Sequence, residues 1–502
     1  MADGSTVRWG TAPARWVLFV TVLGSALGFL DATVVNVALP TIGRDLDAGV
    51  ADLQWTVNGY LLTLAALILL GGALGDRYGR RLVFSVGVVV FTIASALCAF
   101  APTVDVLVAA RVVQGIGGAL LTPGSLAIIE ASFRAADRPR AIGAWSALGG
   151  VATAFGPVLG GWLIDAVSWR AIFFINLPLG VLVVLAAARH VPETRDATAT
   201  GRPDALGAVL VTVGLGGSTF ALIAAPERGL ASAVVLVALV AGVVGLVAFL
   251  LVERRIAHPM LPLDVFASRQ FAVANVLTLV VYAALGGVLF LLAVFLQGAL
   301  GFSPLAAGAA TLPITALMLA LSAHSGALAQ AVGPRRPLTV GPLLLAGGML
   351  LMTRIDPGDE YVTAVLPALV VFGLGLVALV APVTATVLAA ADERHAGVAS
   401  GINNAVARAA QLLAVAVLPV AAGLSGADYA DADALADAFH TAMLISAALA
   451  LAGAAIAWAG IRDDVLDRGE GELEARPHAD GAGAVVDHPP PAVDHPRPLA
   501  SR

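Results

Sequence analysis

The sequence predicts an all-α polytopic membrane protein. Hydrophobic residues make up 59% of the chain and charged residues only 12%, and the mean hydropathy of +0.92 lies far above that of globular domains. Apolar runs of about 20 residues, the length that crosses a bilayer, recur along nearly the whole chain. These runs are continuous in Leu, Val and Ala instead of alternating with polar residues, which excludes a transmembrane β-barrel.

Charged stretches and Gly- or Pro-rich stretches divide the apolar runs into fourteen predicted spans. The predicted spans cover residues 15–37, 53–74, 82–101, 105–130, 140–164, 170–188, 205–225, 231–252, 271–297, 305–329, 337–353, 362–390, 397–424 and 438–461.

The arginines set the orientation of these spans. The chain contains no Lys, and with a cytoplasmic N-terminus the outer loops hold only Arg44, Arg170, Arg228 and Arg354. This asymmetry satisfies the positive-inside rule, so we expect both termini in the cytoplasm. No small-residue cleavage site follows the first apolar run, which we expect to remain as a helix. The Arg, Ala, Gly and Val bias indicates a GC-rich bacterial genome, and the expected location is a bacterial cytoplasmic membrane.

A short internal repeat indicates two related halves. Residues 72–81, GALGDRYGRR, align without a gap with residues 326–335, GALAQAVGPR, and both stretches follow an even-numbered span. Parallel repeats around a central cavity are an architecture of transporters, in which one half rocks against the other. The predicted domains are a six-span N-terminal half (1–189), a linker with two extra central spans (190–269), a six-span C-terminal half (270–462) and a disordered cytoplasmic tail (463–502).

Two opposite charges are predicted inside the membrane at similar depth. Asp31 lies about seven residues before the expected end of the first span near Val37, and Arg111 lies about seven residues into the fourth, so both are about 10 Å below the outer surface. A buried carboxylate is costly unless it is paired, hydrated or protonated, which favours Asp31 as a proton carrier. A capping Asp and a purely structural ion pair remain alternatives.

Other polar residues within the spans are candidates for lining a cavity. In SGINNAVARAAQ, the three- and four-residue spacing puts Asn404, Arg408 and Gln411 on one helix face. That stripe either lines a cavity or makes interhelical hydrogen bonds. Glu130, at the cytoplasmic end of the fourth span, is more simply a solvated helix end. The full set of cavity candidates is Asn58, Gln114, Asn275, Tyr282, Asn404, Arg408 and Gln411.

The glycines of GPVLGG, residues 156–161, have a direct physical interpretation. Gly156, Gly160 and Gly161 allow close helix contact, and Pro157 removes an N–H and bends the fifth span. A tight, bent contact suits a hinge or a seal against leakage, although generic small-residue packing also explains the glycines alone.

Cofactor chemistry has no sequence support. The glycine-rich stretches 149–156 and 214–219 lack the G-K-[ST] ending of a phosphate-binding loop and lie inside hydrophobic spans. Cys98 is the single cysteine, so neither a disulfide nor a thiolate metal site is available. We expect no cofactor, no metal, no enzymatic activity and no nucleic-acid partner, and an ion gradient must then supply the energy.

Five motifs in order resemble the major facilitator superfamily, and within it the fourteen-helix drug:proton antiporters of the EmrB/QacA type. They are LDATVVNVALP (30–40), GGALGDRYGRRLVF (71–84), RVVQGIGGALLTPGSLAII (111–129), GPVLGG (156–161) and SWRAIFFINLPLG (168–180). The resemblance implies a major facilitator fold, proton coupling through Asp31 and Arg111, and an antiporter motif in Gly156, Pro157, Gly160 and Gly161. It also implies a conformational role for the loop residues Gly72, Asp76, Arg77, Gly79, Arg80 and Arg81.

Asp76 suggests a specific use of that loop. The positive-inside rule explains its arginines but not the acid, and the second copy of the repeat replaces Asp76 by Gln330. We expect Asp76 to meet a helix N-terminus or an Arg across the cytoplasmic seam and to lock the outward-facing state.

The expected function is proton-coupled efflux of amphiphilic drugs or antibiotics, with a small drug-like molecule, protons and the lipid bilayer as partners and no protein partner expected. The alternative is a transporter of the same fold for one metabolite, such as a siderophore, a peptide or a nutrient. A membrane sensor or scaffold is a more distant alternative, which the intramembrane polar residues argue against.

Overall fold

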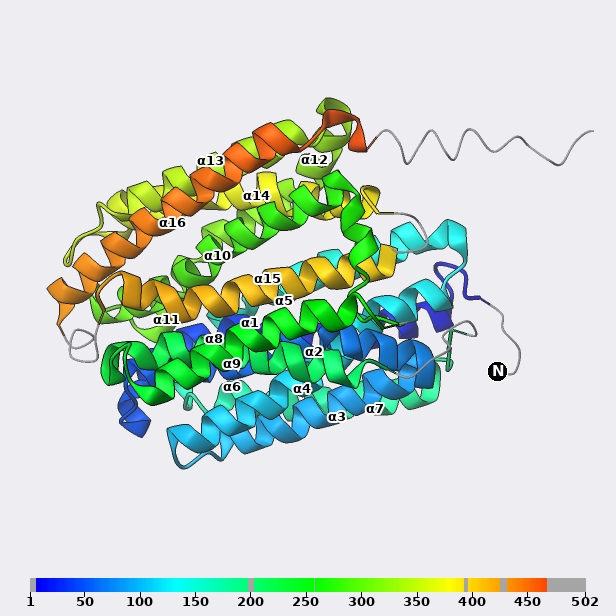
Figure 1. Ribbon diagram of the computed structural model, residues 1–502, viewed down its shortest axis with the longest axis horizontal. Coiled ribbons are helices and arrows are strands. Elements are labelled where there is room, and N and C mark those ends of the chain that lie inside the picture. Colours follow the sequence, from blue (N-terminus) through cyan, green and yellow to red (C-terminus); the bar gives the residue numbers. More distant parts are fainter. Residues whose placement is uncertain (1–5, 197–202, 257, 392–395, 425–430, 467–502) are drawn as a thin grey trace, which may run out of the picture.

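The computed structural model describes residues 6–196, 203–256, 258–391, 396–424 and 431–466. Apart from one β-bridge between Val7 and Phe133, these residues form helices and their connections (Figure 1). The α-helices are α1 (Ala12–Leu46), α2 (Val50–Tyr78), α3 (Arg80–Ala99), α4 (Val104–Ser132), α5 (Arg138–Ala166), α6 (Ala171–Phe174), α7 (Asn176–His190), α8 (Ala205–Arg228), α9 (Ala233–Glu253), α10 (Arg269–Gly298), α11 (Pro304–Ala310), α12 (Leu312–Val332), α13 (Arg335–Met352), α14 (Leu366–Ala389), α15 (Ala396–Ala421) and α16 (Ala432–Gly460). Short 3-10 or π turns are η1 (Ala135–Asp137), η2 (Leu263–Ala267), η3 (Tyr361–Val365) and η6 (Asp463–Val465).

The helices agree with the predicted spans. In the described part of the chain, thirteen helical segments are long and apolar enough to cross a membrane, with α6 and α7, α11 and α12, and η3 and α14 each counting as one segment. The remaining predicted span is α13, an 18-residue helix that begins with Arg335 and Arg336, which lower its hydropathy. The all-α polytopic fold is therefore confirmed.

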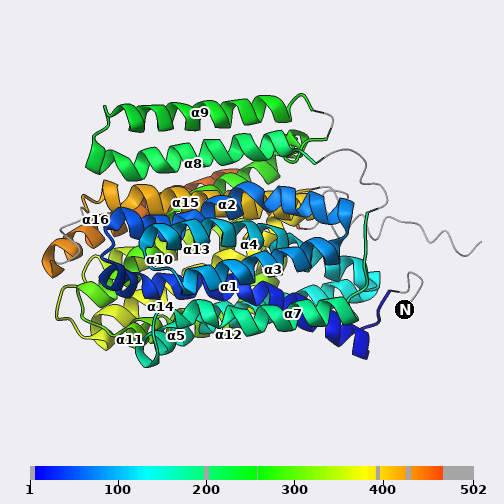
Figure 2. The ribbon, with the colours of Figure 1, turned by 90° about the horizontal axis from the view of Figure 1, so that it is seen from below.

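The helices form two groups with a helical pair between them along the chain. Helices α1 to α7 pack among themselves, as do α10 to α16. The pair α8 and α9 lies on one side of the bundle (Figure 2), where α8 contacts α2 of the first group and α15 of the second. The helical pair therefore covers the seam between the halves, while the residue boundaries of the predicted domains stay predictions. Residues 467–502 of the predicted tail lie outside the described residues.

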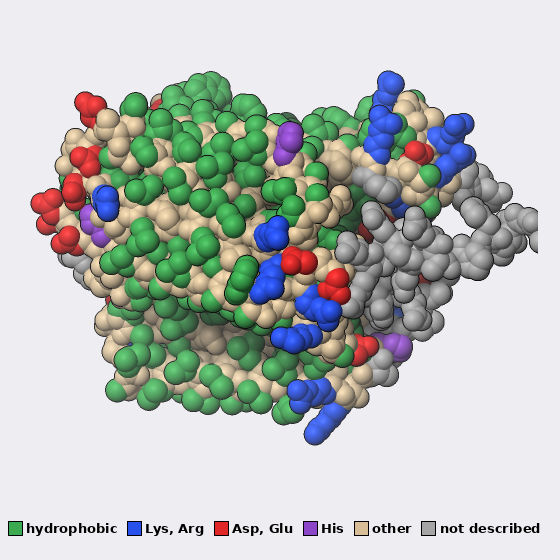
Figure 3. All heavy atoms as spheres, turned by 90° about the horizontal axis from the view of Figure 1, so that it is seen from above, with side chains coloured by type: hydrophobic (Ala, Val, Ile, Leu, Met, Phe, Trp, Pro, Cys, Tyr) green, Lys and Arg blue, Asp and Glu red, His purple; other side chains and the backbone are tan. Residues whose placement is uncertain are grey.

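The two ends of the bundle differ in charge. Figure 3 shows acidic side chains gathered at the left end and most arginines toward the right, with a hydrophobic surface between them. The right end, here called the arginine-rich end, carries the start of α1 and the end of α16 (Figure 1). The left end is called the opposite end.

The first helix is longer than the sequence suggested. Its expected end near Val37 is wrong, because α1 continues through Pro40 to Leu46. Asp31 therefore lies near the middle of α1, about 15 residues and over 20 Å from its end at 1.5 Å per residue. A proline costs a helix one N–H donor, but the apolar packing of Val37, Ala38, Leu39 and Ile42 on both sides of Pro40 holds the helix together.

The repeated turns of the two halves have the same geometry. Gly79, before α3, and Gly333, before α13, both have positive φ, at +123° and +81°. In each turn a carboxylate from the segment after the last helix of that half lies against the glycine: Glu193 at Gly79 and Asp463 at Gly333. A side chain at either glycine would strain the backbone and clash with that acid.

Candidate functional site

The candidate site starts from Asp31 of α1 and Arg111 of α4, the two opposite charges that the sequence placed at similar depth, which form an ion pair in the structure. Asp31 Oδ2 and Arg111 NH1 are 2.5 Å apart, and each side chain is only 1% exposed. Placing the two charges in the bundle interior is tolerable only if their remaining hydrogen-bonding groups also find partners. The surrounding helices supply those partners.

Gln114 of α4 and polar groups from three further helices, α2, α3 and α7, complete the pair. Gln114 donates to Asp31 Oδ1 at 2.9 Å and accepts from Arg111 NH1 at 2.6 Å. Arg111 Nε also donates to the Thr56 carbonyl of α2 at 3.0 Å. Ser95 of α3 accepts from Gln114 at 2.8 Å and from Asn176 of α7 at 3.2 Å. Both oxygens of the Asp31 carboxylate are therefore engaged.

Aromatic rings cover the guanidinium. The Arg111 Cζ lies 4.5 Å from the centre of the Tyr60 ring and 6.0 Å from that of Phe173. A cation over an aromatic face is attracted to the ring by about 1–2 kcal/mol when desolvated. The site around Asp31 is thus closed to solvent in this conformation.

A separate cavity lies among α10, α14 and α15. It has a volume of about 130 Å³, and its lining includes Tyr282, Thr384, Ser400, Asn404 and Arg408. Arg408 NH1 donates to Gln411 on the next turn at 3.1 Å, which orients the guanidinium. Asn404 and Arg408 of the predicted polar stripe therefore line this cavity, whereas Gln411 bonds Arg408 and is not part of the lining.

The remaining cavity candidates lie elsewhere. Gln114 belongs to the Asp31 site, and Asn275 is buried in α10, where it bonds Asn403 at 3.2 Å behind the cavity wall. Asn58 is fully buried, and both its amide atoms lack a hydrogen-bond partner. The expectation that Asn58 lines a cavity therefore does not describe this conformation, in which α2 is packed tightly.

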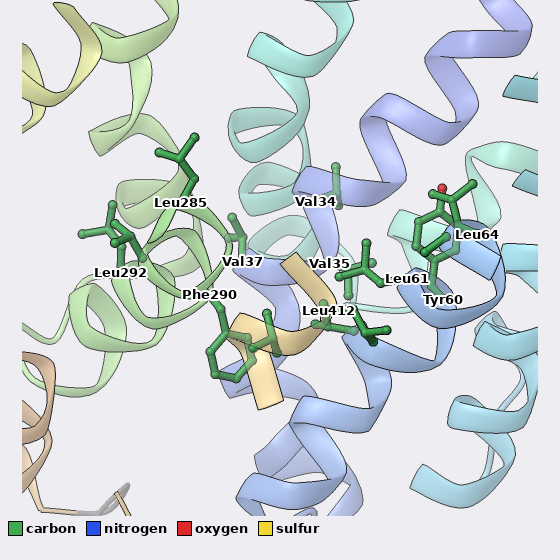
Figure 4. Close-up of a cluster of buried hydrophobic side chains, with 14 of the residues drawn as sticks. Val34, Val35, Val37, Tyr60, Leu61, Leu64, Leu285, Phe290, Leu292 and Leu412 are labelled. Carbon is green, nitrogen blue, oxygen red and sulfur yellow. The ribbon is translucent and has the colours of Figure 1, made fainter. Parts of the chain in front are cut away.

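The two halves are joined at the opposite end. Gln54 of α2 donates to the Val415 carbonyl of α15 at 2.8 Å, and Gln297 of α10 donates to the Val37 carbonyl of α1 at 2.9 Å. The Leu305 N–H donates to Asp165 at 3.1 Å. Apolar side chains from α1 and α2 of one half and from α10 and α15 of the other lie together in one buried cluster (Figure 4). We call these three hydrogen bonds and this apolar packing the outer seal.

The GPVLGG glycines contact both halves at the outer seal. A Cβ at Gly160 would lie 2.6 Å from Val34 of α1, and one at Gly161 would lie 2.6 Å from the Leu305 Cα of α11. Gly156 lies against Thr33, and the Pro157 carbonyl lies against Gly308 of α11. These glycines allow α5 to touch its own half and the other half at once.

The 72–81 loop contacts its own half. Asp76 accepts from Arg80 Nε at 2.9 Å, and the Arg77 guanidinium lies over the ring of Tyr78. Gly72 packs beside Pro123 of α4. Within the described residues, Asp76 makes no ion pair across the seam, so the expected lock is not formed in this conformation.

Glu193 is a site residue that the sequence reasoning missed. Its carboxylate accepts from the Arg81 and Leu82 N–H groups at 3.1 Å each, at the N-terminus of α3, and faces the Arg81 guanidinium at 3.6 Å. A carboxylate is favourable at a helix N-terminus. The only signal in the sequence was an acid following the last helix of each half.

A metal site would need several ligand side chains close together. The described residues contain no cluster of three or more His, Cys, Asp or Glu side chains that would hold an ion.

Comparison with known proteins identifies the family. The sequence-family model described as the Major Facilitator Superfamily matches residues 21–415 of this chain. "Multidrug resistance protein Stp" of Mycobacterium tuberculosis (strain CDC 1551 / Oshkosh) is 37% identical over 80% of this chain and 74% of its own length. "Tetracenomycin C resistance and export protein" of Streptomyces glaucescens is 35% identical over 80% of this chain and 75% of its own length.

Solved structures share the fold at low sequence identity. A POT family transporter in complex with a thioalcohol-conjugated peptide superposes with a TM-score of 0.66 at 13% identity, covering 88% of this chain and 94% of that one. A bacterial homologue of the human lysosomal transporter Spinster, in its inward-facing and unoccupied conformation, gives 0.63 at 16% identity over 91% and 98%. By its sequence match and its helical architecture, the chain belongs to the major facilitator superfamily.

Proposed function

We propose that this protein exports amphiphilic drugs or antibiotics from a bacterial cell in exchange for protons, as a fourteen-helix drug:proton antiporter of the EmrB/QacA type. The Asp31–Arg111 pair carries the proposal, because a carboxylate at this depth is expensive without a function. The relatives named as a multidrug resistance protein and as a tetracenomycin C resistance and export protein support the substrate class.

The orientation follows from charge. With the arginine-rich end in the cytoplasm, the outer seal closes the external side, and the cavity at Arg408 belongs to an inward-facing transporter. Both chain ends then lie in the cytoplasm, as the distribution of arginines also indicates.

Asp31 acts as the proton carrier in this proposal. A proton on Oδ2 removes the negative charge that holds Arg111, while Gln114, the Thr56 carbonyl and the Tyr60 ring still hold the guanidinium. Thr33 and Val34 follow on the same helix and contact Gly156 and Gly160 at the outer seal. A shift of α1 on protonation is thereby passed to the outer seal.

The gradient supplies enough energy for export. Moving one charge through 100 mV yields about 2.3 kcal/mol, to which the pH difference adds. Asp31 is closed to solvent here, so proton entry and release require the alternation of the halves.

Proton release from inside-out vesicles tests this function. Addition of a transported drug should release protons from acidified vesicles carrying the protein, and Asp31→Asn should abolish the release because Asn cannot carry a proton. Asp105→Asn, the same change at an exposed acid in α4, is the control and should release protons normally. Unchanged release in Asp31→Asn would remove Asp31 from the proton pathway.

Asp76 keeps its proposed role as a latch of the outward-facing state. It bonds only Arg80 by its side chain here, as expected when the cytoplasmic side is open and the latch is released. Asp76→Asn should lower the export rate severalfold while leaving drug affinity, measured by equilibrium binding to the purified protein, within about twofold. Lost binding would place Asp76 in the substrate site instead.

A further inference from the structure

Arg408 is a cation in the cavity of the C-terminal half without an acidic partner. Its one hydrogen bond in the described structure goes to the neutral amide of Gln411, and no described carboxylate lies within ion-pair distance. A guanidinium has five N–H donors, so most of its bonding capacity is left for the cavity.

Two acids within the helices of the N-terminal half, Asp31 and Glu130, do not pair with Arg408. Both oxygens of Asp31 are taken by Arg111 and Gln114. Glu130 lies near the arginine-rich end of α4, and no ion pair joins its carboxylate to Arg408. Neither acid is available to neutralise Arg408 in this conformation.

The other residues that line the cavity suit the polar head group of an amphiphilic molecule. Tyr282, Ser400 and Asn404 add neutral polar groups beside Arg408, while Val387 and Ala407 supply apolar wall. A volume of about 130 Å³ holds a head group and a few carbons. The larger apolar body of such a molecule would extend between the two halves.

When the cavity closes, the lack of an acidic partner for Arg408 becomes costly. In an inward-facing cavity water solvates the guanidinium, but closing the cytoplasmic side removes that water and leaves a charge that needs a counter-ion. A ligand with a carboxylate or enolate oxygen supplies the counter-ion and forms charge-assisted hydrogen bonds of the bidentate kind.

We propose that Arg408 binds the acidic head group of the substrate, and that this protein exports organic anions in preference to organic cations. The inference rests on the proposed export function and names the substrate class of its cavity.

A matched set of three pyrene probes tests the charge preference. The probes are 1-pyrenebutyrate, its neutral amide and a pyrenebutyl trimethylammonium ion, which share the apolar body and differ in charge. Equilibrium dialysis against the purified full chain in phosphatidylcholine nanodiscs, with empty nanodiscs subtracted, measures binding without any proton gradient. We expect the carboxylate to bind about tenfold more tightly than the amide, and the cation more weakly still.

Variants at one position assign the preference. Arg408→Gln should bind acid and amide equally while keeping the affinity for the amide, which also shows that the variant is folded. Arg408→Lys should retain part of the preference, and Arg336→Gln, an exposed arginine on α13, should retain all of it. Equal binding of the three probes to the wild-type chain, or an unchanged preference in Arg408→Gln, would overturn the proposal.

Transport measurements distinguish a failure of the anion preference from a failure of the proposed export function. Exchange of a proton for an organic anion moves net charge, whereas one-for-one exchange for a monocation moves none, so carboxylate export should accelerate when an inside-negative potential is imposed. Proton-coupled export of the cation alone would overturn the anion preference and leave the antiport function standing. Carboxylate binding without any proton-coupled transport would uphold the Arg408 site and overturn the antiport function.

Discussion

At the scale of single residues, the N-terminal half surrounds one buried acid with hydrogen-bond donors. Asp31 meets Arg111 and Gln114, and Arg111 in turn meets Thr56 and Tyr60. Removing one partner of such a pair costs more than removing both, because it leaves a buried charge without compensation. The stability of the protein therefore depends on Asp31 and Arg111 together.

Two variants measure this coupling. Arg111→Gln should lower the free energy of unfolding by about 3–5 kcal/mol, because the Asp31 carboxylate is left without its cation. The double variant Asp31→Asn with Arg111→Gln should recover much of that loss. Thermal unfolding of the purified protein measures both, and a double variant no more stable than Arg111→Gln would mean that the ion pair is not what stabilises the site.

In contrast to Asp31, Asn58 is a buried side chain whose amide has no hydrogen-bond partner. An unsatisfied buried amide costs about 1–3 kcal/mol, so Asn58→Leu should raise the stability of the sealed conformation by roughly that amount. The rate of export should fall, since the outward-open state no longer gains by hydrating the amide. Asn275→Leu is the matched control, which should lose stability because Asn275 is hydrogen-bonded. Export at the wild-type rate in a stabilised Asn58→Leu would contradict this account.

At the scale of helices, α5 joins the proton site to the outer seal. One face of its glycine segment packs on α1 through Gly156 and Gly160, and another packs on α11 through Gly161. The three helices can lie this close because glycine has no Cβ. A Cβ at any of these positions would overlap atoms of a neighbouring helix. The close contact of the halves at the outer seal therefore depends on the glycines themselves.

Two alanine substitutions in α5 test this dependence. Gly161→Ala places a methyl group against the backbone of α11 and should separate the halves, lowering export at least severalfold and increasing proton leak through the protein. Gly150→Ala adds the same methyl group to the same helix at a position with no atom within 4 Å, and should behave as wild type. Both are measured in proteoliposomes with an entrapped pH dye, and equal behaviour of the two variants would exclude the tight contact as the seal.

Helix packing also explains which features were predictable from sequence. Asp31 and Arg111 were identifiable because charges stand out in apolar runs, and the spans followed from hydropathy. Ser95 and Asn176 gave no signal, because a small polar residue in an apolar run is equally compatible with packing. Glu193 was missed because its role depends on contact with Arg81, 112 residues earlier in the chain. The end of α1 was misplaced because Pro40 normally ends a helix and here does not.

At the scale of the whole molecule, the described contacts place the two halves in one of their alternating arrangements. The outer seal joins the halves at the opposite end, α8 covers one side of the seam, and the cavity at Arg408 lies in the C-terminal half. The proposed proton site lies in the N-terminal half, and this cavity lies in the C-terminal half. Coupling between proton and substrate must then act through the movement of the halves, so loss of the proton site should uncouple transport without removing the route for the drug.

The central claim is that Asp31 couples the movement of the halves to the proton gradient. In proteoliposomes with an imposed pH gradient, the wild-type protein should accumulate a transported drug against its concentration gradient. Asp31→Asn should show no such uphill accumulation, yet it should still pass the drug down a concentration gradient, because the side chains that line the cavity at Arg408 are unchanged. Uphill accumulation by Asp31→Asn would contradict the account.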